Sequence, residues 1–62
     1  MKKQIVSLYD ELKANNGIIP SAWLPYIELI KLGLKLAKMF TNDNVDEIID
    51  EILAAIDLLE QS

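Results

Sequence analysis

The apolar residues of the first fourteen positions recur with the period of an α-helix. The residues that share this spacing are Ile5, Leu8, Tyr9 and Leu12. Most charged side chains of the stretch fall between them, so we expect a first helix over about residues 2–14. It should end at Asn15-Asn16-Gly17, because glycine readily adopts the left-handed conformation that follows many helix ends. Ile18 is then expected to fold back on the last turn.

The segment from Trp23 to Phe40 is much more apolar, and we expect a second helix over about residues 22–40. Pro25 fits only a first turn, so the regular helix should start between Ser21 and Pro25. On a helical wheel the apolar residues cover roughly 280° of the circumference, which is typical of a largely buried helix. The charged residues share one narrow arc, made of Glu28, Lys31, Lys35 and Lys38.

The last third of the chain predicts a third helix over about residues 45–60. Asn44, followed three residues later by Glu47, is typical of a helix N-cap. The apolar face that should turn inward consists of Val45, Ile48, Ile49, Ile52, Leu53, Ala55, Ile56 and Leu59. The opposite, acidic face consists of Asp46, Glu47, Asp50, Glu51 and Asp57.

Together these patterns predict a single all-α domain over residues 1–62, with a short first helix and a hairpin of the second and third. Two neighbours conceal about two-thirds of the second helix's apolar arc, so we expect a homodimer or higher oligomer to complete a helical bundle. Gly33 and Ala37, one turn apart, are the expected point of closest helix crossing. The residues predicted to meet a second copy or another protein are Trp23, Tyr26, Ile30, Gly33, Leu34, Ala37 and Phe40.

Composition supports self-association. A chain of 62 residues buries a small core, and this one has neither Cys nor His to add disulfides or zinc, although 52% of it is hydrophobic. Its basic residues are six Lys and no Arg, against ten acids, which gives a net charge of −4 and argues against nucleic-acid binding. The seven acids after residue 42 stand without a Lys among them, so opposite charges on the second and third helices are expected to aid register between copies.

Candidate chemistry is sparse. Asn42, Asn44 and Asp46 alternate as at the start of a calcium loop, but the bend glycine is missing and helix capping explains them better. The hydroxyl groups have no His to activate them, and the acidic helix offers no dry pocket. We therefore predict no enzyme, no metal and no cofactor.

The predicted function is that of a non-enzymatic assembly or interaction protein acting through helix–helix contacts. The Lys-, Ile- and Asn-rich, Arg-free composition is compatible with a small microbial or phage accessory or structural protein. Two alternatives stay open: a membrane-surface-active amphipathic protein, from the lysines beside the apolar arc, and an acidic-helix inhibitor of a basic partner. No signal peptide or clear transmembrane helix is recognised, and we expect a cytoplasmic location or one within an assembled particle.

Overall fold

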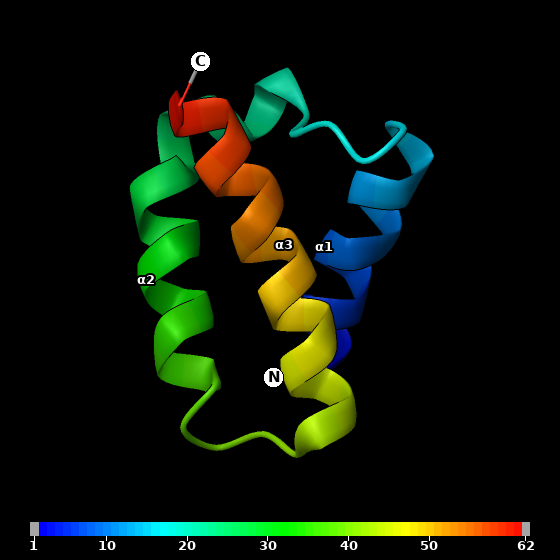
Figure 1. Ribbon diagram of the computed structural model, residues 1–62, viewed down its shortest axis with the longest axis vertical. Helices are drawn as coiled ribbons and strands as arrows, with labels where there is room; N and C mark the ends of the chain where they lie inside the picture. The colour runs from blue at the N-terminus through cyan, green and yellow to red at the C-terminus, as the bar shows by residue number, and fades with distance from the viewer. Residues whose placement is uncertain (1, 62) are drawn as a thin grey trace.

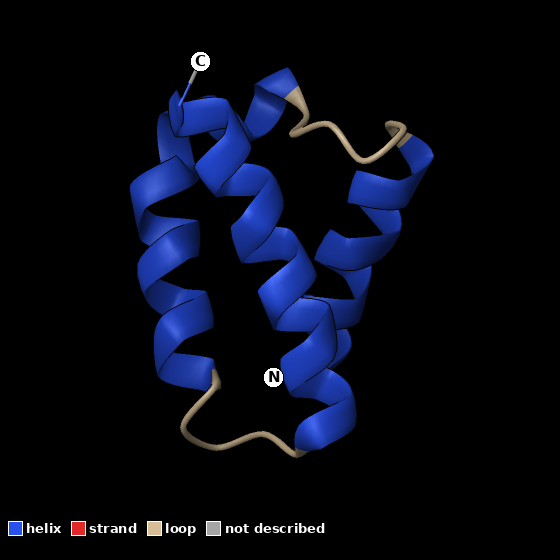
Figure 2. Cartoon of the chain, in the orientation of Figure 1, coloured by secondary structure: helices blue, strands red, loops and turns tan. Residues whose placement is uncertain are grey.

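Three α-helices and one short 3₁₀ helix make up the computed structural model, which describes residues 2–61 (Figure 1). The elements are α1 (Lys2–Ala14), the 3₁₀ helix η1 (Ser21–Tyr26), α2 (Ile27–Ala37) and α3 (Asp43–Gln61). Turns and loops connect them, and no strand occurs between residues 2 and 61 (Figure 2). The prediction of an all-α, three-helix fold is confirmed.

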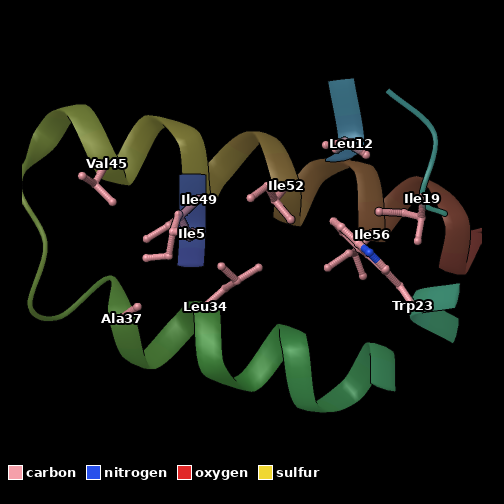
Figure 3. Close-up of a cluster of buried hydrophobic side chains, with 10 residues drawn as sticks. All are labelled: Ile5, Leu12, Ile19, Trp23, Leu34, Ala37, Val45, Ile49, Ile52 and Ile56. Carbon is pink, nitrogen blue, oxygen red and sulfur yellow. The ribbon is translucent and has the colours of Figure 1, made fainter. Parts of the chain in front are cut away.

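The third α-helix, α3, is the structural centre of the molecule. It lies between α2 and α1 in the view of Figure 1 and packs against both. Three of its isoleucines, Ile49, Ile52 and Ile56, have no exposed surface at all. Figure 3 shows them among side chains from every other helix; the buried residues it draws are Ile5, Leu12, Ile19, Trp23, Leu34, Ala37, Val45, Ile49, Ile52 and Ile56. The core therefore forms around α3.

The first helix stops where the sequence predicts. The backbone amide of Gly17 donates to the carbonyl oxygen of Leu12 at 2.9 Å, and that of Asn16 donates to Lys13 at 3.1 Å. Asn16 has the positive φ angle, 61°, that this type of helix end requires, so the left-handed position expected for glycine is taken by Asn16; Gly17 after it also has a positive φ, 76°. The expectation for Ile18 was wrong, because its side chain is exposed and Ile19 enters the core in its place.

The second helical segment is interrupted, contrary to the prediction of one helix over residues 22–40. Pro25 lies inside η1, and the α-helix begins at Ile27, after the proline. Because proline has no amide hydrogen and its ring crowds the preceding turn, an α-helix running through it is disfavoured. At the other end α2 stops at Ala37, and the amides of Met39 and Phe40 donate three residues back, which tightens the chain into the turn before α3.

The last helix begins earlier than predicted, at Asp43. The Asn42 side-chain oxygen accepts a hydrogen bond from the Val45 amide at 3.2 Å, and the Asn42 carbonyl accepts from the Asp46 amide at 2.9 Å. Thr41 adds a hydrogen bond from its hydroxyl to the Asp46 carboxylate. Asn42 is thus the N-cap, and the prediction of Asn44 in that role was wrong, because the helix had already begun when the chain reached it.

Candidate interaction surface

Large apolar side chains cover the outer side of α2 and the turn that follows it. Leu29, Leu32 and Leu36 recur at the i, i+3 and i+7 positions of one helix face. Met39 and Phe40 follow in the turn after the helix. The exposed fractions of the five side chains are 69%, 57%, 53%, 74% and 77%, respectively. We call these five residues the α2 face. Contiguous apolar surface of this kind is typical of a protein interaction site on a small domain.

The α2 face continues into a shallow groove of about 330 Å³ between α1 and α2. The residues that line it are Gln4, Ile5, Leu8, Ile30, Gly33, Leu34 and Ala37. Gly33 lies at its edge, where a Cβ atom would meet nothing within 4 Å. Both α1 and α2 pack on α3 more than on each other, which leaves this apolar groove open between them.

Three of the residues predicted to form an interface belong to the core instead. Trp23, Leu34 and Ala37 are buried within one chain. The indole N–H of Trp23 donates to a carboxylate oxygen of Glu11 at 3.1 Å, which gives its polar atom a partner. The folded chain already covers most of these three side chains, although Leu34 and Ala37 still line the open groove.

The other predicted interface residues are accessible to different degrees. Tyr26 and Phe40 are exposed, Gly33 borders the open groove, and Ile30 is half-buried. The expected close crossing at Gly33 and Ala37 does not occur within the chain, since Ala37 turns inward and Gly33 meets no neighbour.

Sequence reasoning missed the three leucines of the α2 face, Leu29, Leu32 and Leu36. The signal was present in their i, i+3, i+7 spacing. It was hidden because the apolar arc of this helix is wide enough to contain two faces, one for the core and one for the outside.

Two of the three lysines of this segment, Lys31 in α2 and Lys38 in the turn that follows it, form ion pairs with α3 of the same chain. Lys31 Nζ lies 2.7 Å from Glu60 Oε1, and Lys38 Nζ lies 2.7 Å from Asp50 Oδ1. The hydrogen bond from Lys31 lowers the pKa of the Glu60 carboxyl, and the bonds to Glu60 and Asp50 raise the pKa of Lys31 and Lys38. These two opposite-charge contacts link α2 and the turn after it to α3 within one chain, and contacts of this kind between copies stay a prediction.

The acidic face of α3 is partly engaged by these contacts. Asp50 pairs with Lys38, and Asp46 accepts the hydrogen bond from Thr41. Glu47, Glu51 and Asp57 are exposed. The face predicted to bind a basic partner thus has two of its five acids engaged by neighbours in the chain.

The described residues contain neither a cluster of potential metal ligands nor a helix suited to spanning a membrane. Between residues 2 and 61 no three His, Cys, Asp or Glu side chains gather where they would hold a metal ion. Among the helices of that same range, none combines the length and apolarity needed to cross a membrane. Comparisons with protein-family models, with curated proteins and with solved structures find no match for the chain.

Proposed function

We propose that the protein is a non-enzymatic interaction protein that self-associates through the α2 face. The observation that carries this proposal is the exposure of Leu29, Leu32 and Leu36 on one face of α2, and of Met39 and Phe40 in the turn that follows it. Full burial of a large apolar side chain contributes about 1.5–3 kcal/mol, and these partly exposed side chains would each contribute a fraction of that against the cost of association. The Arg-free, Lys- and Ile-rich composition supports a role as a small accessory or structural component of a microbe or phage.

A second copy of the chain is the occupant we propose for the α2 face. The leucine spacing suits packing of one helix against another, because i, i+3 and i+7 residues interdigitate across a helix pair. In a two-fold symmetric dimer the same face of each chain packs against the other, so a single interface removes both α2 faces from water. The edge beside Leu32 carries both an acid, Glu28, and a base, Lys35, which is the balance of charges that a self-complementary surface needs.

The two alternative functions have weaker support. Two of the three lysines expected to line a membrane-binding stripe, Lys31 and Lys38, are held by acids of α3 instead. The acidic face that the inhibitor hypothesis requires is partly engaged within the chain, since Asp50 pairs with Lys38. The inhibitor hypothesis does not account for the leucines of the α2 face, whereas an anionic membrane surface would also cover them, so vesicle binding must be tested beside self-association.

Sedimentation equilibrium over a range of protein concentrations tests the proposal. We expect the natural chain to change from its monomer mass of 7.0 kDa towards twice that mass as the concentration rises through the micromolar range. Leu32→Glu should abolish the transition, because a carboxylate placed in a closed apolar contact loses its hydration without gaining a partner. A monomer mass at every concentration up to the millimolar range would refute self-association.

A matched control is available on α3. Leu58 is as exposed as Leu29, at 69%, but it lies outside the α2 face. Leu58→Glu should keep the self-association of the natural chain, and circular dichroism should give the same helical content for both variants. Loss of self-association in Leu58→Glu with retention in Leu32→Glu would place the contact elsewhere. Binding of the monomer to anionic vesicles, checked by the Trp23 emission spectrum, would favour the membrane alternative instead.

A further inference from the structure

Two opposite charges flank the α2 face on the same edge. Glu28 and Lys35 are seven residues apart, which is close to two full turns, so they lie one above the other beside Leu32. Both residues are exposed. Between residues 2 and 61 the ion pairs closer than 4 Å are Lys31–Glu60 and Lys38–Asp50, and neither includes these two charges. Both do lie near the Glu60 carboxyl group, and both contribute to lowering its pKa.

The opposite edge of the α2 face is uncharged. It is formed by Gly33 and Ile30, beyond which the groove to α1 begins. The charge pattern therefore depends on the direction in which a second helix lies across the face. In an antiparallel helix pair equivalent edges face each other, whereas in a parallel pair the charged edge of one helix faces the uncharged edge of its partner. Only the antiparallel arrangement brings Glu28 and Lys35 opposite charged residues.

We propose that two copies pair their α2 helices antiparallel, with Glu28 of each chain opposite Lys35 of the other. This inference rests on the proposed self-association and adds its direction and register. The two-fold axis then passes close to residues 31 and 32, so Leu32 lies near the centre of the contact. Leu29 and Leu36 lie on either side of it. The two symmetric ion pairs close the charged edge, and the leucines fill the contact between them.

In this register the second copy packs over the open space beside Gly33. A helix lying across the α2 face approaches the backbone most closely where the side chain is smallest, and a Cβ atom at Gly33 meets nothing within the chain. The space there is continuous with the groove lined by Leu8 and Ile30. Bulky side chains of the second copy, such as its Tyr26, have room to pack there.

Reversal of each charge tests the register. Glu28→Lys places two lysines opposite each other at each end of the contact, and Lys35→Glu places two glutamates there. Each single variant should therefore dimerise roughly three- to tenfold more weakly than the natural chain. The double variant carries both reversals and should recover the natural dissociation constant, because its pairs are again opposite in charge. An equimolar mixture of the two single variants should form a heterodimer in preference to either homodimer.

The two single variants change the net charge in opposite directions, which distinguishes the effect of this register from general electrostatic repulsion between the chains. Glu28→Lys raises the net charge from −4 to −2 and Lys35→Glu lowers it to −6. General repulsion between acidic chains would therefore strengthen the first variant and weaken the second, whereas the register weakens both. Glu47→Lys changes the net charge as Glu28→Lys does, but on the acidic face of α3, and it should not weaken the dimer. Opposite effects of the two single variants, or no recovery in the double variant, would overturn the register.

Cysteine cross-linking tests the direction independently, since the natural chain has no Cys. In an antiparallel pair of Leu36→Cys chains the two introduced thiols lie about 10 Å or more apart along the helix, beyond the reach of a disulfide. This variant should therefore stay uncross-linked under mild oxidation, whereas Leu32→Cys, near the two-fold axis, should cross-link readily. Cross-linking of Leu36→Cys would show a parallel pair and overturn the inference while leaving self-association intact. A chain that stays monomeric in sedimentation would instead refute the proposed function itself.

Discussion

The two helices of the hairpin, α2 and α3, use their apolar residues in opposite ways. α3 carries most of the acids of the chain, yet three of its isoleucines are completely buried. α2 is the more apolar helix by sequence, yet its leucines at positions 29, 32 and 36 are more than half exposed. The apolar content of a helix therefore does not decide how far it is buried.

The number of neighbours accounts for the difference. α3 has α1 on one side and α2 on the other, and a narrow apolar stripe is enough to fill the space between them. α2 has α3 and the end of η1 as its main neighbours, so its wide apolar arc extends beyond what they cover. Between residues 2 and 61 no other helix covers the remainder. The excess on α2 is what makes self-association a reasonable proposal.

The largest expected effect comes from truncating matched side chains on the two helices. Ile52→Ala leaves a cavity in the core and should lower the free energy of unfolding by about 2–5 kcal/mol. Leu32→Ala, in dilute monomer, should change it by about 0.5 kcal/mol or less, because that side chain is already in water. Urea unfolding followed by circular dichroism measures both. Similar losses in the two variants would contradict the assignment of core and exposed face; Ile52→Val provides a milder core variant if Ile52→Ala does not fold.

The helix starts provide the next comparison, since α3 begins with a side-chain cap and no side-chain cap hydrogen bond is made at the start of α2. Asn42→Ala removes the acceptor for the Val45 amide and should cost about 1 kcal/mol. Asn44→Ala, two residues further on, should lower the free energy of unfolding by at most about 0.3 kcal/mol, because Asn44 lies inside the helix and alanine favours helix. Thermal unfolding of both variants decides between them. Greater loss in Asn44→Ala would restore Asn44 as the N-cap.

A substitution within α2 should act in the opposite direction. Gly33→Ala adds a methyl group where the chain leaves open space, and alanine is favoured over glycine inside a helix by about 0.8–1.0 kcal/mol. Dilute monomer of this variant should therefore be more stable in urea unfolding by about that amount. Gly33→Trp should leave the monomer folded but weaken dimerisation far more than Lys35→Trp does. A less stable Gly33→Ala monomer would mean that the space beside Gly33 is needed within the chain.

Local signals made most of the architecture predictable. Asn15-Asn16-Gly17 ends the first helix through hydrogen bonds that depend only on nearby residues, and the isoleucine spacing of α3 matches the side that it buries. The interruption at Pro25 was partly predictable, because proline excludes an α-helix through its own position but does not decide whether the preceding turn becomes a 3₁₀ helix. Asn42 and Asn44 are equally good caps by residue type, so the choice between them depended on how the chain turns out of α2.

The candidate site was less predictable, because it depends on packing between distant segments. Leu34 and Leu36 are equivalent by residue type and lie on the same wide apolar arc, yet the first enters the core and the second stays exposed. The spacing of Leu29, Leu32 and Leu36 shows that they share a face, but which face of the arc turns inward is decided by where α3 lies. The same holds for Trp23, whose partner Glu11 lies on a different helix.

The smallest effect expected concerns the ion pair that links the two helices, Lys31–Glu60. The pKa of the Glu60 carboxyl is lowered in the folded chain, so its contribution to stability is present above the ordinary value of 4.5 and is lost as the pH falls through the folded pKa. The pKa of Lys31 is raised, so its contribution is present below 10.5 and is lost as the pH rises through the folded pKa. The stability difference between the natural chain and Lys31→Met should thus be constant from about pH 5 to pH 10 and shrink on either side.

Thermal unfolding across this range measures the difference, and nuclear magnetic resonance titration of Glu60 should give a lower pKa in the natural chain than in the variant. Equal Glu60 titration in the two proteins would mean that the Lys31–Glu60 pair is not formed in solution, and that the apolar core and the Lys38–Asp50 pair hold α2 against α3 without it.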